Sequence, residues 1–194
     1  MVVGASLGGL HALEILLAGL PQNFPLPMAI AQHRHKNADA LSAVLQRKCA
    51  LPLSEAEDKE VIAPGHVYLA PADYHLLVEV GCLALSTEAP VAYARPSINV
   101  LFESAADAYG KRVIGVILTG SSDDGAKGLA TIKANGGIPI VQEPTTAQSP
   151  TMPKAAINAL QKQRSPNTAL ATDWILPLCD IAALIVNLCY PALR

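Results

Sequence analysis

Short apolar runs alternate with helical segments along this chain, and that alternation constrains the fold more than any other feature of the sequence. The runs are Val2-Val3, LPMAIAQH at 26–33, KRVIGVILTG at 111–120 and IPIVQ at 138–142. Between the first two, apolar residues recur at helical spacing at Leu10, Leu13, Leu17 and Leu20. Buried parallel strands joined by helices give this pattern. We therefore predict an α/β fold, a doubly wound and mostly parallel sheet with helices on both faces, Rossmann-like in architecture.

The remaining segments add further helices and one hairpin. We expect HVYLAP (66–71) to be a strand and HLLVEVGCLALST (75–87) to fold into a β-hairpin around Gly81. Ser97 can cap a helix that carries Ile98, Leu101, Phe102 and Ala105. Further helices are expected after Asp39, around Leu129 and Ile132, and over Met152–Leu160. The apolar segment from Trp174 to Leu193 is interrupted by Pro177, Asp180 and Asn187, which predicts a buried terminal helix rather than a membrane span.

Length and charge exclude several classes of protein. A chain of 194 residues fits a single domain, 1–194. Its net charge is −2 with no block of Lys or Arg, so a nucleic acid is not expected as a partner. The four cysteines form no CxxC pair and no signal peptide is apparent, so we expect reduced, mostly buried cysteines in a cytoplasmic protein that does not insert into membranes.

Reactive side chains follow three of the predicted strands. Ser6 follows the first, His33 the second, and Asp123 and Asp124 follow GVILTG. The carboxyl ends of parallel strands lie at one edge of a sheet, where open α/β folds place their sites. We therefore expect these groups to converge although they are far apart in the sequence.

The turn around Ser6 favours a nucleophile and leaves two alternatives open. Gly4-Ala5-Ser6-Leu7-Gly8 fits the pattern G-x-S-x-G between a strand and a helix, in which a sharp turn exposes the serine and the next N–H, here that of Leu7, stabilises an oxyanion. A helix cap or structural turn would need the same small residues. A nucleotide loop is the third reading, but Ser6 stands where G-x-G-x-x-G requires its second glycine.

The predicted roles of the other groups follow from their chemistry. Histidine ordinarily titrates near neutrality, so His33 is the expected base for a serine. His35 extends the stretch to H-R-H, but no third ligand at a suitable spacing supports a metal site. One aspartate of the pair Asp123 and Asp124 can orient His33, and we expect at least one of the two to cap the following helix.

Several stretches together resemble the catalytic domain of the chemotaxis receptor methylesterases (CheB type). They are GASLGG, AQHRHKN, HVYLAPADYHLLV, RPSINVLFESAADAYG, GVILTGSSDDGAKGL and GGIPIVQEPTTAQSPTMPKAAI, in the family's order and over nearly the whole chain. The resemblance implies the triad Ser6, His33 and Asp124, with Leu7 and Ser121 near the oxyanion. Three positions depart from the family's pattern, namely Leu7 for a usual Thr, Ser121 for an apolar residue, and Asn99 for the Asp of its RPS-x-D motif.

The resemblance also implies an activity. It implies a serine hydrolase that demethylates glutamate methyl esters, and can deamidate glutamines, on the cytoplasmic helices of chemoreceptors, with no metal or organic cofactor. The family's usual N-terminal receiver domain is not expected within these 194 residues. Two alternatives remain open: a receptor-binding module of the same fold that turns over poorly, and a nucleotide-binding α/β domain.

Overall fold

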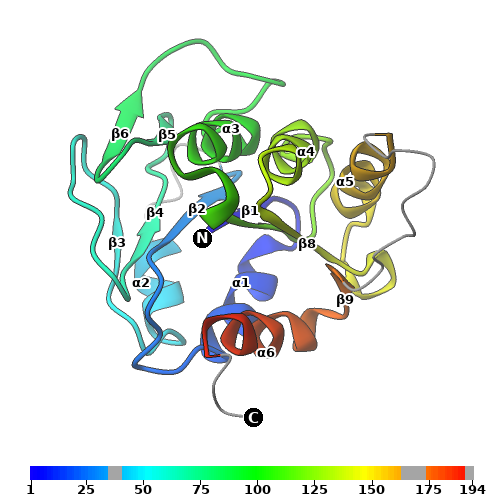
Figure 1. The fold of residues 1–194 in the computed structure, drawn as a ribbon, viewed down its shortest axis with the longest axis horizontal. Helices are drawn as coiled ribbons and strands as arrows, with labels where there is room; N and C mark the ends of the chain where they lie inside the picture. Colours follow the sequence, from blue (N-terminus) through cyan, green and yellow to red (C-terminus); the bar gives the residue numbers. More distant parts are fainter. Residues whose placement is uncertain (35–40, 163–173, 191–194) are drawn as a thin grey trace.

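A seven-stranded parallel sheet forms the centre of the molecule in the computed structural model, which describes residues 1–34, 41–162 and 174–190 (Figure 1). Its strand order is β3-β4-β2-β1-β7-β8-β9. The strands are β1 (Val2–Ala5), β2 (Met28–Gln32), β3 (Leu53–Glu55), β4 (Val67–Leu69), β7 (Ile114–Ile117), β8 (Ile138–Gln142) and β9 (Ile175–Leu176). The predicted α/β architecture is confirmed.

Helices cover both faces of this sheet. Figure 1 shows α3 (Ile98–Tyr109), α4 (Ala126–Ala134) and α5 (Thr151–Lys162) on one face, and α1 (Gly9–Ala18), α2 (Leu41–Gln46) and α6 (Leu178–Cys189) on the other. Two short 3₁₀ helices, η1 (Gly110–Arg112) and η2 (Pro144–Thr146), complete the helical elements among the described residues. The doubly wound arrangement follows from strands that are buried on both faces.

Alternate residues of the central strand pack into two different hydrophobic cores. Val3 and Ala5 of β1 belong to the core beneath α1 and α6, whereas Val2 belongs to the core beneath α3, α4 and α5. Successive side chains of a strand point to opposite faces, so a strand between two helical layers must be apolar at every position. This is the physical reason why the runs in the sequence are continuous rather than alternating.

The predicted hairpin lies at the side of the sheet. Strands β5 (His75–Val78) and β6 (Leu83–Ser86) pair antiparallel and form a separate two-stranded sheet, with Gly81 at φ +88° in the turn. The hairpin packs against α3, whose buried residues Ile98, Leu101, Phe102 and Ala105 lie on one face. Ser97 caps this helix as predicted, because its Oγ accepts a hydrogen bond from the Val100 N–H.

Two segments differ from the sequence-based expectation. The segment from Trp174 onward is not one buried helix: it forms the short edge strand β9 and then the half-buried helix α6, and its last residues lie outside the described part of the chain. Pro177 separates the two elements, since proline cannot donate within a helix and favours its start. Strand β3 was not expected; none of its three residues is fully buried, as befits an edge strand.

The order of the strands reverses next to β1. The chain proceeds from β1 to β2 and β4 on one side, and from β1 to β7, β8 and β9 on the other. Crevices at such reversals, beyond the carboxyl ends of the strands, hold the sites of open α/β sheets. The segments after β1, β2 and β7 carry Ser6, His33 and the two aspartates, so these groups meet at the reversal.

None of the described helices is both long and apolar enough to cross a membrane.

Candidate active site

Ser6 and His33 leave two neighbouring strands side by side. The register of β1 and β2 pairs Ala5 with Gln32, and Ser6 and His33 are the next residues of each strand. The His33 N–H donates to the Ala5 carbonyl at 3.0 Å, which continues the ladder beyond the last pair. Adjacent strands lie about 4.8 Å apart, so the two side chains start within reach of each other.

The turn after Ser6 is tight and depends on glycine. Gly8 has a φ of +81°, and a Cβ at this position would lie 2.6 Å from the Gln148 Oε1. The backbone of Ser6 is fixed by its N–H, which donates to the Thr119 carbonyl at 2.9 Å. Gly8, not Ser6, is the N-cap residue of α1, and no side chain caps this helix. The reading of Ser6 as a helix cap is therefore wrong, and its hydroxyl is not used in that way.

Asp124 is fully buried and accepts hydrogen bonds from four donors. They are His33 Nε2 (2.8 Å), Ser97 Oγ (2.9 Å), and the N–H groups of Ile98 (2.7 Å) and Asn99 (3.0 Å). Two of these donors are backbone groups in the first turn of α3. An anion at the N-terminus of a helix is stabilised by the free N–H groups and the helix dipole.

The capping prediction for the aspartate pair is wrong. The N-cap of α4 is Gly125, in the left-handed region at φ +92°, and neither aspartate side chain bonds to the N–H groups at the start of this helix. The free N–H groups of this end are instead satisfied by Asn99, whose Oδ1 accepts from Gly125 (3.0 Å) and Gly128 (2.8 Å). Each side chain therefore accepts hydrogen bonds from the start of the other's helix. Asp124, just before α4, accepts from the first N–H groups of α3, and Asn99 of α3 accepts from N–H groups at the start of α4.

The environment of Asp124 keeps it ionised. Burial by itself raises the pKa of this carboxyl, but the hydrogen bonds from His33, Ile98 and Asn99 outweigh burial and hold its pKa below the usual value. An ionised carboxylate only accepts hydrogen bonds, so the proton of the shared bond must sit on His33 Nε2. In the neutral imidazole the other ring nitrogen, Nδ1, then carries no proton and can act as a base.

The predicted site residues other than Asp124 line one surface depression of about 590 Å³. Ser6, Leu7, His33 and Ser121 all line it, while Asp124 lies fully buried behind His33. Asp123 is exposed, and its side chain makes no hydrogen bond within the described part of the chain. Four further polar residues on the wall, His11, Glu14, Gln32 and Gln148, were not predicted as site residues from the sequence. Gln32 could have been noticed as the one polar residue of a buried strand.

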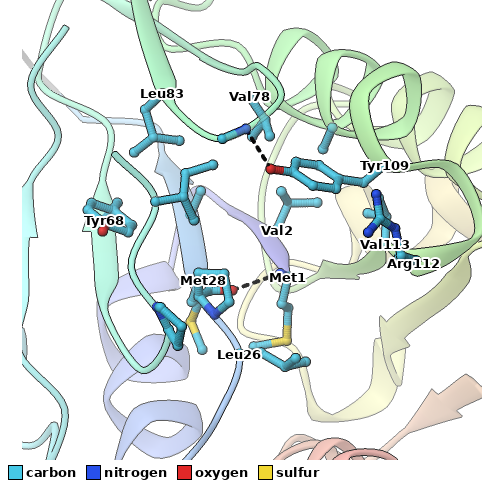
Figure 2. Close-up of a pocket in the computed structure, with 16 residues that line it drawn as sticks. Met1, Val2, Leu26, Met28, Tyr68, Val78, Leu83, Tyr109, Arg112 and Val113 are labelled. Carbon is cyan, nitrogen blue, oxygen red and sulfur yellow. Dashed lines mark hydrogen bonds between the residues drawn. The ribbon is translucent and has the colours of Figure 1, made fainter. Parts of the chain in front are cut away.

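A second cavity lies at the opposite end of the sheet. It has a volume of about 370 Å³, and Val2, Met28 and Val113 place it at the amino ends of the strands. Figure 2 shows Tyr109 and Arg112 at one side of it, with the Tyr109 hydroxyl accepting a hydrogen bond from the Gly81 N–H. Its walls are mainly apolar and it contains none of the predicted site residues.

Other polar residues have structural partners. His75 is buried, accepts from the Ser97 N–H through Nδ1 and contacts the Ala89 carbonyl through Nε2. His66 contacts Ser54 at 2.9 Å, while His35 lies outside the described residues. Within the described ranges no group of three or more His, Cys, Asp or Glu could hold a metal ion.

The cysteines are free, but they are less buried than expected. Cys49 alone is buried; Cys82 and Cys189 are half-buried and Cys179 is exposed.

Comparisons with known proteins agree on one family. Residues 1–184 match the family model described as CheB methylesterase. A protein of Leptospira interrogans, provisionally named a protein-glutamate methylesterase/protein-glutamine glutaminase, is 42% identical over 190 residues, which cover 97% of this chain and 93% of the relative. An Anaeromyxobacter dehalogenans protein with the same activities in its name is 42% identical over 93% of this chain, which spans about half (50%) of that relative. The crystal structure of the Thermotoga maritima CheB methylesterase catalytic domain superposes with a TM-score of 0.87 at 32% identity, over 96% of each chain.

Proposed function

Because the chain belongs to the CheB methylesterase family, we propose that it hydrolyses glutamate methyl esters on the cytoplasmic helices of chemoreceptors and releases methanol. The observation that carries the proposal is the contact between His33 Nε2 and the buried Asp124 Oδ2 at 2.8 Å, next to Ser6 at the end of the neighbouring strand. A serine, a histidine and an ionised carboxylate in this relation are the components of a hydrolytic triad.

The reaction starts at Ser6. His33 Nδ1 accepts the proton of the Ser6 hydroxyl as the oxygen attacks the ester carbonyl, which forms a tetrahedral intermediate. The bond from the carbonyl carbon to the methoxy oxygen then breaks, and the imidazolium returns its proton to the departing methanol. Water attacks the acyl-serine in the same way, with His33 again as base, and releases the glutamate carboxylate and free Ser6.

Asp124 has two duties in this scheme. Its hydrogen bond keeps the proton of neutral His33 on Nε2, so that Nδ1 is free to accept from Ser6. Its negative charge stabilises the imidazolium that forms in each step. Hydrogen bonds from Ser97, Ile98 and Asn99 hold the carboxylate in place.

The oxyanion of the intermediate needs donors on the open side of Ser6. The Leu7 N–H immediately follows the nucleophile, and Ser121 lines the same depression. Donors fixed in advance toward the developing charge contribute about 3–4 kcal/mol each in other serine hydrolases. The same apparatus can release ammonia from a glutamine, the second activity in the names of the relatives.

Labelling with a fluorophosphonate and an assay of methanol release test the proposal. We expect the probe to label Ser6 and the chain to release methanol from a methylated receptor fragment, and Ser6→Ala to abolish both. Ser54→Ala is the matched control, since Ser54 also contacts a histidine, His66, at 2.9 Å. Stabilisation by a nucleotide without labelling would favour the nucleotide-binding alternative, and receptor binding without labelling the non-catalytic module.

A further inference from the structure

Gln32 contacts the main chain of two triad residues at once. It is the last residue of β2, its side chain is buried, and its Nε2 donates to the carbonyls of Ser6 (2.9 Å) and His33 (3.0 Å). Its two N–H groups are therefore both used, one on each of the segments that carry the nucleophile and the base.

The bond to the Ser6 carbonyl also determines where the Leu7 N–H points. The Ser6 carbonyl and the Leu7 N–H belong to one peptide unit, which is planar and trans, so the two groups point in opposite directions. A second donor, the Gly9 N–H, holds the same carbonyl at 2.8 Å. The Leu7 N–H donates to no other described residue, so it remains available on the side of the depression.

The far side of the turn is fixed as well. Thr119 Oγ1 donates to the Leu7 carbonyl at 2.9 Å, and the Thr119 carbonyl accepts from the Ser6 N–H at 2.9 Å. Gln32 of β2 thus holds the peptide unit that contains the Leu7 N–H, and Thr119, two residues beyond β7, holds the peptide units on either side of it. A carbonyl that accepts hydrogen bonds also polarises its own peptide, which strengthens the N–H as a donor.

Stability alone does not explain a glutamine at position 32. Its Oε1 is buried and accepts no hydrogen bond from the described residues, and an unpaired buried oxygen destabilises a fold. The fit also restricts position 9, because a Cβ on Gly9 would lie 2.0 Å from this oxygen. The unpaired Oε1 of Gln32 is unfavourable for stability, whereas its Nε2 supplies two hydrogen bonds to the segments that carry Ser6 and His33.

We propose that Gln32 is a positioning residue for the reaction: it aims the Leu7 N–H at the oxyanion and fixes the main chain of His33 beside Ser6. The inference rests on the proposed function, since it takes Ser6 as the nucleophile. It adds to the triad a side chain that acts through the main chain of Ser6 and His33.

The test measures how fast a fluorophosphonate labels Ser6, which needs both the base and an oxyanion donor but no receptor. We compare wild type with Gln32→Met, which keeps the volume and loses both donors. The control is Gln46→Met, because Gln46 also donates through Nε2 to two carbonyls, those of Cys49 (3.1 Å) and Leu51 (3.0 Å), away from the site. We expect Gln32→Met to label about 10-fold to 100-fold more slowly and Gln46→Met at the wild-type rate.

A second variant separates positioning from general stability. In Gln32→Glu the buried carboxyl has a raised pKa, and only its protonated form can donate a hydrogen bond. The labelling rate of Gln32→Glu relative to wild type should therefore rise between about pH 8 and about pH 6, while the ratio for Gln32→Met stays constant. Protonation of a buried carboxyl also restores stability, so the rates are compared only at pH values at which circular dichroism shows Gln32→Glu to be folded.

The outcomes are distinct. A labelling rate of Gln32→Met within about fivefold of wild type, or no rise for Gln32→Glu on acidification, overturns the inference. Circular dichroism checks that each variant is folded, and if Gln32→Met is not, Gln32→Glu decides alone. Wild type that labels at Ser6 but releases no methanol from receptor esters refutes the proposed substrate and leaves the role of Gln32 supported by the labelling rates. Absence of labelling in wild type overturns both.

Discussion

Replacing Asp124 with asparagine tests the arrangement of the triad most directly, because the change alters charge and hydrogen bonding with almost no change in shape. The two carboxylate oxygens have different partners. Oδ2 accepts from His33 Nε2 and the Ile98 N–H, and Oδ1 accepts from the Ser97 hydroxyl and the Asn99 N–H. An asparagine can present its oxygen to one of these pairs only, so its NH₂ group must face the other.

Each orientation of the amide has a definite cost. If the NH₂ group takes the place of Oδ2, it opposes the Ile98 N–H and donates to His33 Nε2, which moves the ring proton to Nδ1, where it blocks proton transfer from Ser6. If it takes the place of Oδ1, the Ser97 hydroxyl can turn and accept, but the Asn99 N–H is left facing another donor. One backbone N–H loses its acceptor in either case, which costs about 1–3 kcal/mol of stability.

We expect Asp124→Asn to lower kcat by about 10²–10⁴-fold, because the charge opposite the imidazolium is lost in both orientations and tautomer control is lost in the first. Methanol release from a methylated receptor fragment measures the effect, and circular dichroism checks that the fold is intact. Asp123→Asn is the matched control: Asp123 is exposed and makes no side-chain hydrogen bond within the described ranges, so its replacement should cost less than about tenfold. A larger loss in Asp123→Asn than in Asp124→Asn would refute the reasoning.

Three further predictions follow from the same contacts. The pKa of Asp124 is lowered in the folded state, so its ionised form stabilises the fold above the ordinary aspartate pKa. This stabilisation is lost as the pH falls through the folded-state pKa. Urea titrations at several pH values should show the loss in wild type and a smaller one in Asp124→Asn. kcat/KM for methanol release should fall on acidification because protonated His33 cannot accept the Ser6 proton, and a flat profile from about pH 5 to about pH 8 would exclude it as the base. Gly125→Ala should lower the free energy of unfolding by about 2–4 kcal/mol, since its φ is +92° and a Cβ would lie 2.5 Å from Ile98 Cγ2. Gly136→Ala, with φ +81° but its nearest atom at 3.4 Å, should lose only about 1 kcal/mol, and equal urea midpoints for the two variants would contradict this account.

The errors of the sequence-based reading have a common cause. From the sequence we expected an aspartate to cap the helix that follows it. In the structure the Asp124 carboxylate accepts hydrogen bonds from the start of α3, and the Asn99 amide oxygen accepts them from the start of α4. Local preference describes which residue types can cap a helix, but a helix start is open to any donor or acceptor that the tertiary fold brings close. Strands β3 and β9 were missed for a related reason, because edge strands of two or three half-buried residues carry too little apolar pattern to be recognised.

The layered α/β fold, and the strand ends that carry Ser6, His33 and Asp124, can be predicted from the sequence alone. Burial on both faces of a parallel sheet imposes continuous apolar runs, and polar residues that end such runs mark the edge where a site forms. Three contacts depend on tertiary packing: His33 Nε2 faces Asp124, Asp124 accepts from the start of α3, and Gln32 donates to the Ser6 carbonyl. These bonds join residues that are 26 to 91 positions apart in the sequence. Their geometry depends on how whole strands and helices pack against one another, which a local sequence pattern does not specify.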